Sequence, residues 1–173
     1  MVVRLALALA MIVVPRTENS PSPTVHTPEI EQRLNLALEA FETAGLELPE
    51  IEVRFAPDPT SCRGHDGYFQ PKFSPWRLTI CSERDYVLLH ELAHAWAEAR
   101  LDDAKKQRFV DRLGLPSWND KGDDWGDRGT EVAAFTIQQN LEDRVVPNSR
   151  TWRQRMADFE FLTGQRSPLR AAR

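Results

Sequence analysis

The sequence predicts an α+β domain spanning residues 27–165, in which a first helix and a small sheet precede a series of further helices. Two observations carry this prediction. Apolar residues recur at helical spacing over residues 28–44, and no Gly or Pro interrupts the stretch 85–100; apolar and charged residues alternate over 51–55 and around Leu78 and Ile80. A chain of 173 residues with 41% hydrophobic side chains favours one domain with a real core.

The first helix is predicted by its ends as well as by its period. Thr27 is a good cap, and Pro28 is tolerated at the first helical position. Gly45 is expected to stop the helix, which gives an element over 28–44. A half-buried strand is expected over 51–55, ended by two prolines.

A second strand is predicted around Leu78 and Ile80, and a short strand around Tyr68 is expected to pair with it. Cys62 and Cys81 lie on either side of this stretch. In an exported protein these thiols are expected to form a disulfide. It would close a loop of about 20 residues and stabilise the fold by about 3 kcal/mol.

The amino end bears on the compartment. A charged start and ten unbroken apolar residues, Leu5 to Val14, are typical of a signal peptide, and the run is shorter than the ~20 residues of a membrane span. A buried first helix or strand is the alternative. Residues 15–26 are predicted to form a Pro/Ser-rich linker and 166–173 a tail. The protein is therefore expected to be secreted or extracytoplasmic.

The predicted helix over 85–100 contains the sequence His90-Glu91-Leu92-Ala93-His94. Residues four apart lie on one face of a helix, so both imidazoles can reach one metal ion. A zinc ion held by two histidines and a carboxylate keeps a fourth position for water. Glu91, turned by about 100° from the histidine row, flanks that position and is the predicted general base.

The third zinc ligand has to come from elsewhere in the chain. Glu98 lies about 12 Å from His90 along the helix axis, which is too far to share an ion. Downstream acids are better placed. The sequence favours Glu131, at the start of a predicted helix over 131–141 whose small alanines permit close helix packing, and it leaves Asp127 as the alternative.

These residues resemble a known family. The segment His90 to Trp96, the segment Arg128-Gly129-Thr130-Glu131-Val132-Ala133-Ala134 and the upstream Cys62-Arg63-Gly64 are similar to the short zinc metallopeptidases of actinobacteria, which are gluzincin-like zincins. The resemblance covers roughly 51–141. It implies a zincin fold, a small twisted sheet over the active-site helix with a later helix supplying the last ligand, here Glu131.

The resemblance implies hydrolysis of peptide bonds in a protein or peptide substrate, with zinc-bound water attacking and Glu91 moving its proton. A zincin-fold binding or structural protein without turnover is the alternative, which the intact Glu91 disfavours. Tyr68, His65 and Arg128 are visible donors for an oxyanion, but each is expected to be structural. Phe135 stands where the thermolysin branch has an Asp that orients a histidine, which leaves Asp124 and Asp127 as candidates for that role.

Composition excludes one function class. The net charge is −4 and the basic residues are scattered among acids, so no nucleic-acid footprint is expected. The oligomeric state stays open.

Two further amphipathic stretches are expected to be scaffold, a charged helix over 102–112 and a stripe at Trp152, Met156 and Phe159. Four tryptophans are expected in the core or closing the domain rather than at a substrate: Trp96, Trp118, Trp125 and Trp152.

Overall fold

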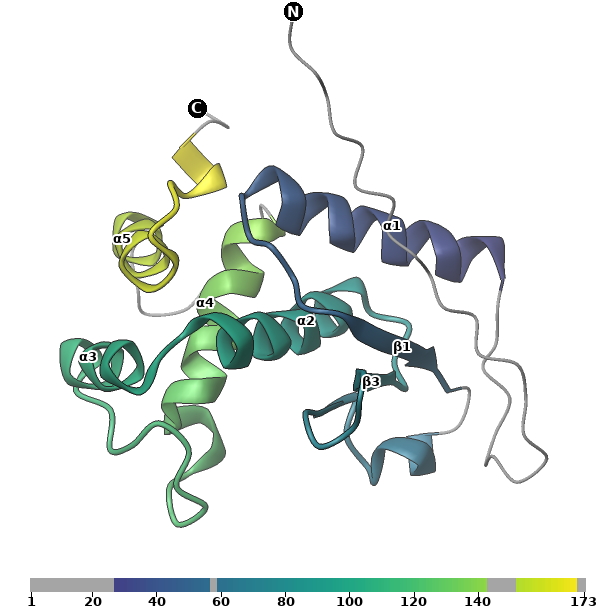
Figure 1. Cartoon of the computed structure of the whole chain (residues 1–173), viewed down its shortest axis with the longest axis horizontal. Helices are drawn as coiled ribbons and strands as arrows, with labels where there is room; N and C mark the ends of the chain where they lie inside the picture. Colours follow the sequence, from purple (N-terminus) through teal and green to yellow (C-terminus); the bar gives the residue numbers. More distant parts are fainter. Residues whose placement is uncertain (1–26, 57–58, 143–151, 171–173) are drawn as a thin grey trace, which may run out of the picture.

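The computed structural model describes residues 27–56, 59–142 and 152–170 (Figure 1). Within these ranges the chain forms five α-helices and one three-stranded sheet, an α+β architecture as predicted. The helices are α1 (Pro28–Thr43), α2 (Asp85–Arg100), α3 (Asp103–Leu113), α4 (Gly129–Leu141) and α5 (Trp152–Thr163), and the strands are β1 (Ile51–Phe55), β2 (Gly67–Gln70) and β3 (Trp76–Ile80).

The predicted signal peptide over 1–14 and the predicted linker over 15–26 lie outside the described residues. Among the helices that the structure describes, none combines the length and the apolar composition that crossing a membrane requires.

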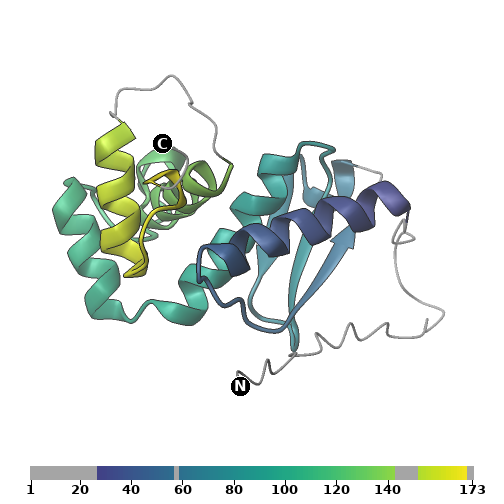
Figure 2. The same ribbon diagram turned by 90° about the horizontal axis from the view of Figure 1, so that it is seen from above.

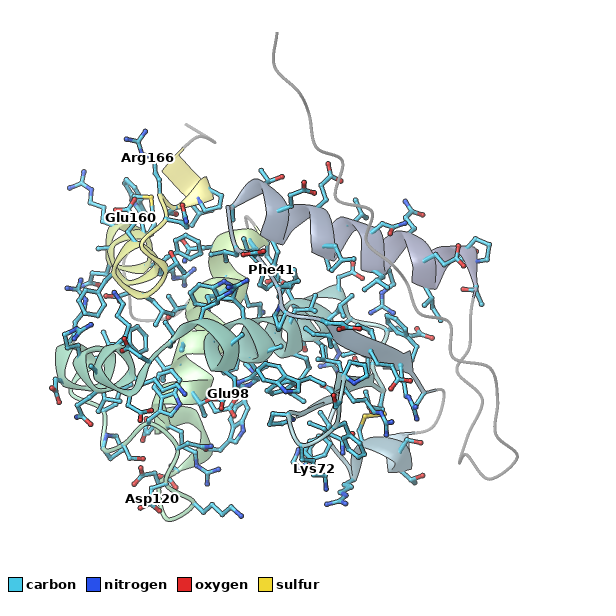
Figure 3. All side chains as sticks on the ribbon, in the orientation of Figure 1. Phe41, Lys72, Glu98, Asp120, Glu160 and Arg166 are labelled. Carbon is cyan, nitrogen blue, oxygen red and sulfur yellow. A yellow bond between two sulfur atoms is a disulfide. The ribbon has the colours of Figure 1, made fainter. Side chains whose placement is uncertain are left out.

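Helix α1 begins and ends where its sequence predicts. The Thr27 hydroxyl accepts a hydrogen bond from the Ile30 N–H at 3.3 Å and so caps the first turn. Gly45 follows the last turn with a φ of 70°, a left-handed conformation that glycine adopts without strain. Phe41, buried to 1% exposure, points from α1 toward α2 and joins the two helices in one core (Figure 3).

The sheet has the strand order β1-β3-β2. Strands β1 and β3 are parallel, with Val53 opposite Leu78, and β2 is antiparallel to β3, with Phe69 opposite Leu78. The predicted pairing of the Tyr68 strand with the Leu78 strand is confirmed. Leu78 and Ile80 are almost fully buried, whereas β2 lies at the edge of the sheet and contacts α2.

Helix α2 connects two halves of the molecule. Figure 2 shows α1 and the sheet on one side of it and α3, α4 and α5 on the other. Its apolar side chains are buried nearly all round, as expected for a central helix. Helix α4 crosses α2 and makes the most extensive helix–helix contact among the described elements. Ala93 of α2 and Ala134 of α4 are fully buried, which is consistent with the close approach predicted from the alanines.

The predicted disulfide between Cys62 and Cys81 is present. It ties the short 3₁₀ helix η1 (Pro59–Cys62) to the residue that follows β3, and the Cys81 N–H donates to the Asp66 carbonyl at 2.8 Å. The loop that leads into β2 is therefore fixed at both of these points. A structural disulfide is compatible with an extracellular protein.

The two predicted scaffold stretches are buried as expected. Phe109 of α3 and Phe159 of α5 are fully buried, and Met156 is 4% exposed.

The prediction of a tail over 166–173 is wrong for its first residues. Ser167 is 2% exposed because its hydroxyl donates to the Asn140 side chain of α4 at 2.7 Å, and the 3₁₀ helix η3 (Pro168–Arg170) also contacts α4.

Candidate metal centre

Three side chains meet where α4 crosses α2. The Nε2 atoms of His90 and His94 lie 3.1 Å apart, and the Glu131 Oε2 lies 3.2 Å from the first and 3.3 Å from the second. Among the residues that the structure describes, these three side chains form a group that could hold a metal ion. The predicted row of His90 and His94 is thus joined by Glu131.

The other acids that the sequence offers as ligands lie elsewhere. Asp127 is exposed in the 3₁₀ helix η2 (Trp125–Asp127) and does not belong to this group. Glu98 lies further along α2, where its carboxylate pairs with Lys106 at 3.1 Å (Figure 3). The position of Glu98 therefore agrees with the exclusion based on helical rise.

The hydrogen bonds of His90 determine which of its ring nitrogens carries the proton. Its Nδ1 lies 3.2 Å from the Gln138 Oε1, and the Gln138 Nε2 donates to the Glu142 Oε2 at 3.3 Å. Gln138 therefore presents its carbonyl oxygen to His90, and His90 donates from Nδ1. A neutral His90 then directs the lone pair of Nε2 toward Glu131.

His94 has a corresponding partner on the same helix. Its Nδ1 lies 3.3 Å from the Thr130 hydroxyl, one residue before Glu131. Helix α4 thus supplies the carboxylate and a polar contact to each imidazole, through Thr130, Glu131 and Gln138. Hydrogen bonds of this kind orient histidines that bind metals and raise their basicity.

The three ligand atoms need a proton or a cation among them. In the neutral form of His90 that donates from Nδ1, Nε2 and the Glu131 carboxylate face each other as hydrogen-bond acceptors, and the His94 Nε2 lies within 3.3 Å of both. Acceptors that converge at 3.1–3.3 Å repel one another unless protons or a cation lie among them. The arrangement can therefore hold a cation without moving any of the three side chains far.

Burial and the two rings act on Glu131 in opposite directions. Burial raises the pKa of this carboxyl, but hydrogen bonds and electrostatic attraction involving His90 and His94 outweigh burial and lower the pKa to about 2. Glu131 is consequently ionised at neutral pH, which is the state that a metal ligand requires.

Glu91 lies beside this triangle and is 8% exposed. Burial is the main cause that raises the pKa of its carboxyl to about 7; the nearby charge of Glu131 adds to this, while His90 and the Phe69 backbone N–H, which donates to the carboxylate, oppose it. The carboxylate also packs on the backbone of Gly67, where a Cβ atom would lie only 2.7 Å from Cγ and Oε1 of Glu91. The edge strand β2 therefore fixes the position of Glu91.

Sequence reasoning missed the residues that orient the imidazoles. Asp124 and Asp127 are the candidates that the sequence offers for this role, but both are exposed, and Gln138 and Thr130 occupy the positions instead. Phe135, which stands where the thermolysin branch has an Asp, packs its ring 4.5 Å from that of His90. The helical period could have indicated Gln138, because a residue seven positions after Glu131 lies on the same face of α4.

The three oxyanion candidates lie as follows. The Arg128 guanidinium donates to the backbone carbonyls of Lys121 and Asp123 rather than to the predicted carboxylates. Tyr68 stacks under the Arg63 guanidinium at 5.8 Å. His65 is exposed in the loop before β2.

The expectation for the tryptophans is wrong for one of them. Trp96 is buried to 5% exposure and Trp118 packs against the core, but Trp125 is 53% exposed.

No protein-family model matches the sequence, and no curated protein or solved structure is significantly similar to it. The function is therefore inferred from the chemistry of the site.

Replacing Gln138 tests the orientation of His90. Gln138→Ala removes the acceptor from Nδ1, so the affinity for Zn²⁺ is expected to fall about 10- to 100-fold, measured by competition with a chromophoric chelator. Gln107→Ala is the matched control, because Gln107 is exposed on α3 and bonds to Asp111. Equal zinc affinities of Gln138→Ala and the wild type would contradict this role.

Proposed function

We propose that this protein is a zinc-dependent peptidase of the zincin type. The observation that carries the proposal is the triangle of two imidazole nitrogens and one carboxylate oxygen, with a second buried carboxylate, Glu91, directly beside it. A set of two histidines and one glutamate is the ligand set of catalytic rather than structural zinc sites, which are closed by four protein ligands.

Both the donor atoms and their spacing favour zinc. Imidazole suits zinc, whereas calcium and magnesium take oxygen ligands. Zinc–ligand bonds of about 2.0–2.1 Å at tetrahedral angles place the ligand atoms about 3.3 Å apart. The three separations in this site are 3.1, 3.2 and 3.3 Å. His90, His94 and Glu131 therefore fit a tetrahedral ion that has one position left for a small ligand.

Zinc in such a site supplies two things when bound, a polarised substrate carbonyl and a water of lowered pKa. Glu91 takes a proton as the water oxygen bonds to the carbonyl carbon of the scissile peptide. The carbon–nitrogen bond then breaks, and the proton passes from Glu91 to the leaving amine. The products are a carboxylic acid and an amine, and no oxidant or further reactant is needed.

Two features of the fold support the zincin assignment. The edge strand β2 contacts α2 and holds Glu91 through Gly67 and Phe69, while the later helix α4 brings Glu131 to the histidines. This is the order of elements that the resemblance to short actinobacterial metallopeptidases implies. The Cys62–Cys81 disulfide favours a location outside the cytoplasm, because disulfides persist in oxidising compartments. The proposed substrates are proteins or peptides.

Glu91→Gln separates metal binding from chemistry. The amide keeps the shape of the side chain but cannot accept the proton, so zinc content is expected to stay at the wild-type level while hydrolysis of a peptide library is lost. Glu98→Gln is the matched control, since it makes the same change on the same helix at a side chain paired with Lys106. Hydrolysis retained by Glu91→Gln would refute the mechanism.

Gly67→Ala tests whether β2 positions the base. The new Cβ would lie 2.7 Å from Glu91 Oε1, so the carboxylate has to move. We expect kcat to fall at least about tenfold with zinc content unchanged, because a displacement of about 1 Å at a catalytic group has effects of this size or larger. Gly126→Ala is the control, since a Cβ there meets no atom within 4 Å. An unchanged kcat in Gly67→Ala would show that the position of Glu91 does not depend on this contact.

A further inference from the structure

We infer that Trp125 determines the substrate preference of this site, by receiving a bulky apolar side chain that flanks the scissile bond. The inference rests on the proposed peptidase function and extends it to a class of substrate. It follows from the exposure of the indole, from its distance to a proposed zinc ligand and from the way its backbone is held.

The Trp125 side chain is exposed to solvent. Among the described residues, the exposed large hydrophobic side chains are Trp125 at 53% and Leu36 at 58%. Leu36 lies on α1, whereas Trp125 is the first residue of η2, four residues before α4 begins at Gly129. Tryptophan is enriched where proteins contact ligands, because its large ring contributes much apolar area.

The indole belongs to a row of aromatic rings that ends at the metal centre. Trp125 meets Phe135 edge to face, with ring centroids 5.6 Å apart, and Phe135 packs 4.5 Å from the His90 ring. The Trp125 and His90 centroids are 6.3 Å apart. Consecutive Cα atoms of a peptide are about 3.8 Å apart, so a side chain next to a carbonyl held at this centre is within reach of the indole.

Hydrogen bonds hold the backbone of the loop that carries Trp125. The Arg128 guanidinium donates to the carbonyls of Asp123 at 2.9 Å and Lys121 at 3.2 Å, which closes the loop before α4. The Asp127 N–H donates to the Asp124 carbonyl at 3.0 Å. Asp120 lies on the same loop between α3 and α4 (Figure 3). A preorganised ring loses little conformational freedom when it binds, which favours its use in recognition.

The apolar surfaces favour an apolar over a basic partner. Phe135 extends the indole by a second aromatic ring, and the two rings together offer carbon surface next to His90. Asp124 and Asp127 are exposed on either side of Trp125 in the sequence, so a lysine or arginine side chain is the competing occupant. The contacts among Trp125, Phe135 and His90 favour a phenylalanine or leucine side chain as the occupant.

Amino-acid hydroxamates test this without depending on turnover. A hydroxamate binds zinc through two oxygens and carries one side chain beside them. For the zinc-loaded wild type we expect the phenylalanine hydroxamate to bind at least about tenfold more tightly than the alanine hydroxamate by calorimetry. In Trp125→Ala this ratio is expected to fall to about twofold or less, with zinc content and alanine hydroxamate affinity unchanged.

Two further variants sharpen the result. Trp125→Phe keeps an aromatic ring, so it is expected to keep most of the preference for the phenylalanine hydroxamate. Leu36→Ala removes the second large hydrophobic side chain that is exposed among the described residues, and this variant is expected to bind all the hydroxamates like the wild type.

The inference is overturned if the ratio is unchanged in Trp125→Ala, if the lysine hydroxamate binds most tightly, or if no hydroxamate binds the zinc-loaded protein. A failure of the proposed function looks different. A wild type that shows the expected preference but cleaves no peptide would refute the peptidase and leave the apolar contact at Trp125 supported.

Discussion

The structure depends on one electrostatic constraint, the convergence of two imidazole nitrogens and one carboxylate oxygen from two crossing helices. His90 and His94 come from α2 and Glu131 from α4, with separations of 3.1–3.3 Å. Such a triangle is costly without a cation or protons among its members. The buried alanines at the crossing bring the helices close, and the polar contacts from Thr130 and Gln138 orient the rings.

The rest of the fold places a second carboxylate beside that triangle. The small sheet is held against α2 by β2, whose backbone at Gly67 and Phe69 contacts the Glu91 side chain. The disulfide fixes the loop that leads into β2. The two halves of the molecule therefore contribute differently, since α4 completes the proposed metal site and the sheet holds the proposed base. Helix α2, which carries both histidines and Glu91, belongs to both halves.

Local sequence patterns predicted most of this and failed where contacts are long-range. The helical and alternating periods gave the bounds of α1 and β1 almost to the residue, since these elements have clear caps and turns. The spacing of His90 and His94 is local, and Glu131 was favoured by its helix. Gln138 lies on the same face of α4 as Glu131, but its contact with His90 depends on α4 crossing α2, which a short-range pattern does not encode. The exposure of Trp125 likewise depends on the folded chain.

The most direct test of the account is the zinc content of two variants after dialysis, measured by elemental analysis. Glu131 lies in the triangle and Asp127 is exposed in η2, although both were compatible with the sequence. The account predicts about one zinc ion per chain in the wild type and in Asp127→Ala, and a large loss in Glu131→Ala. A Glu131→Ala variant that keeps its zinc while Asp127→Ala loses it would contradict the central claim.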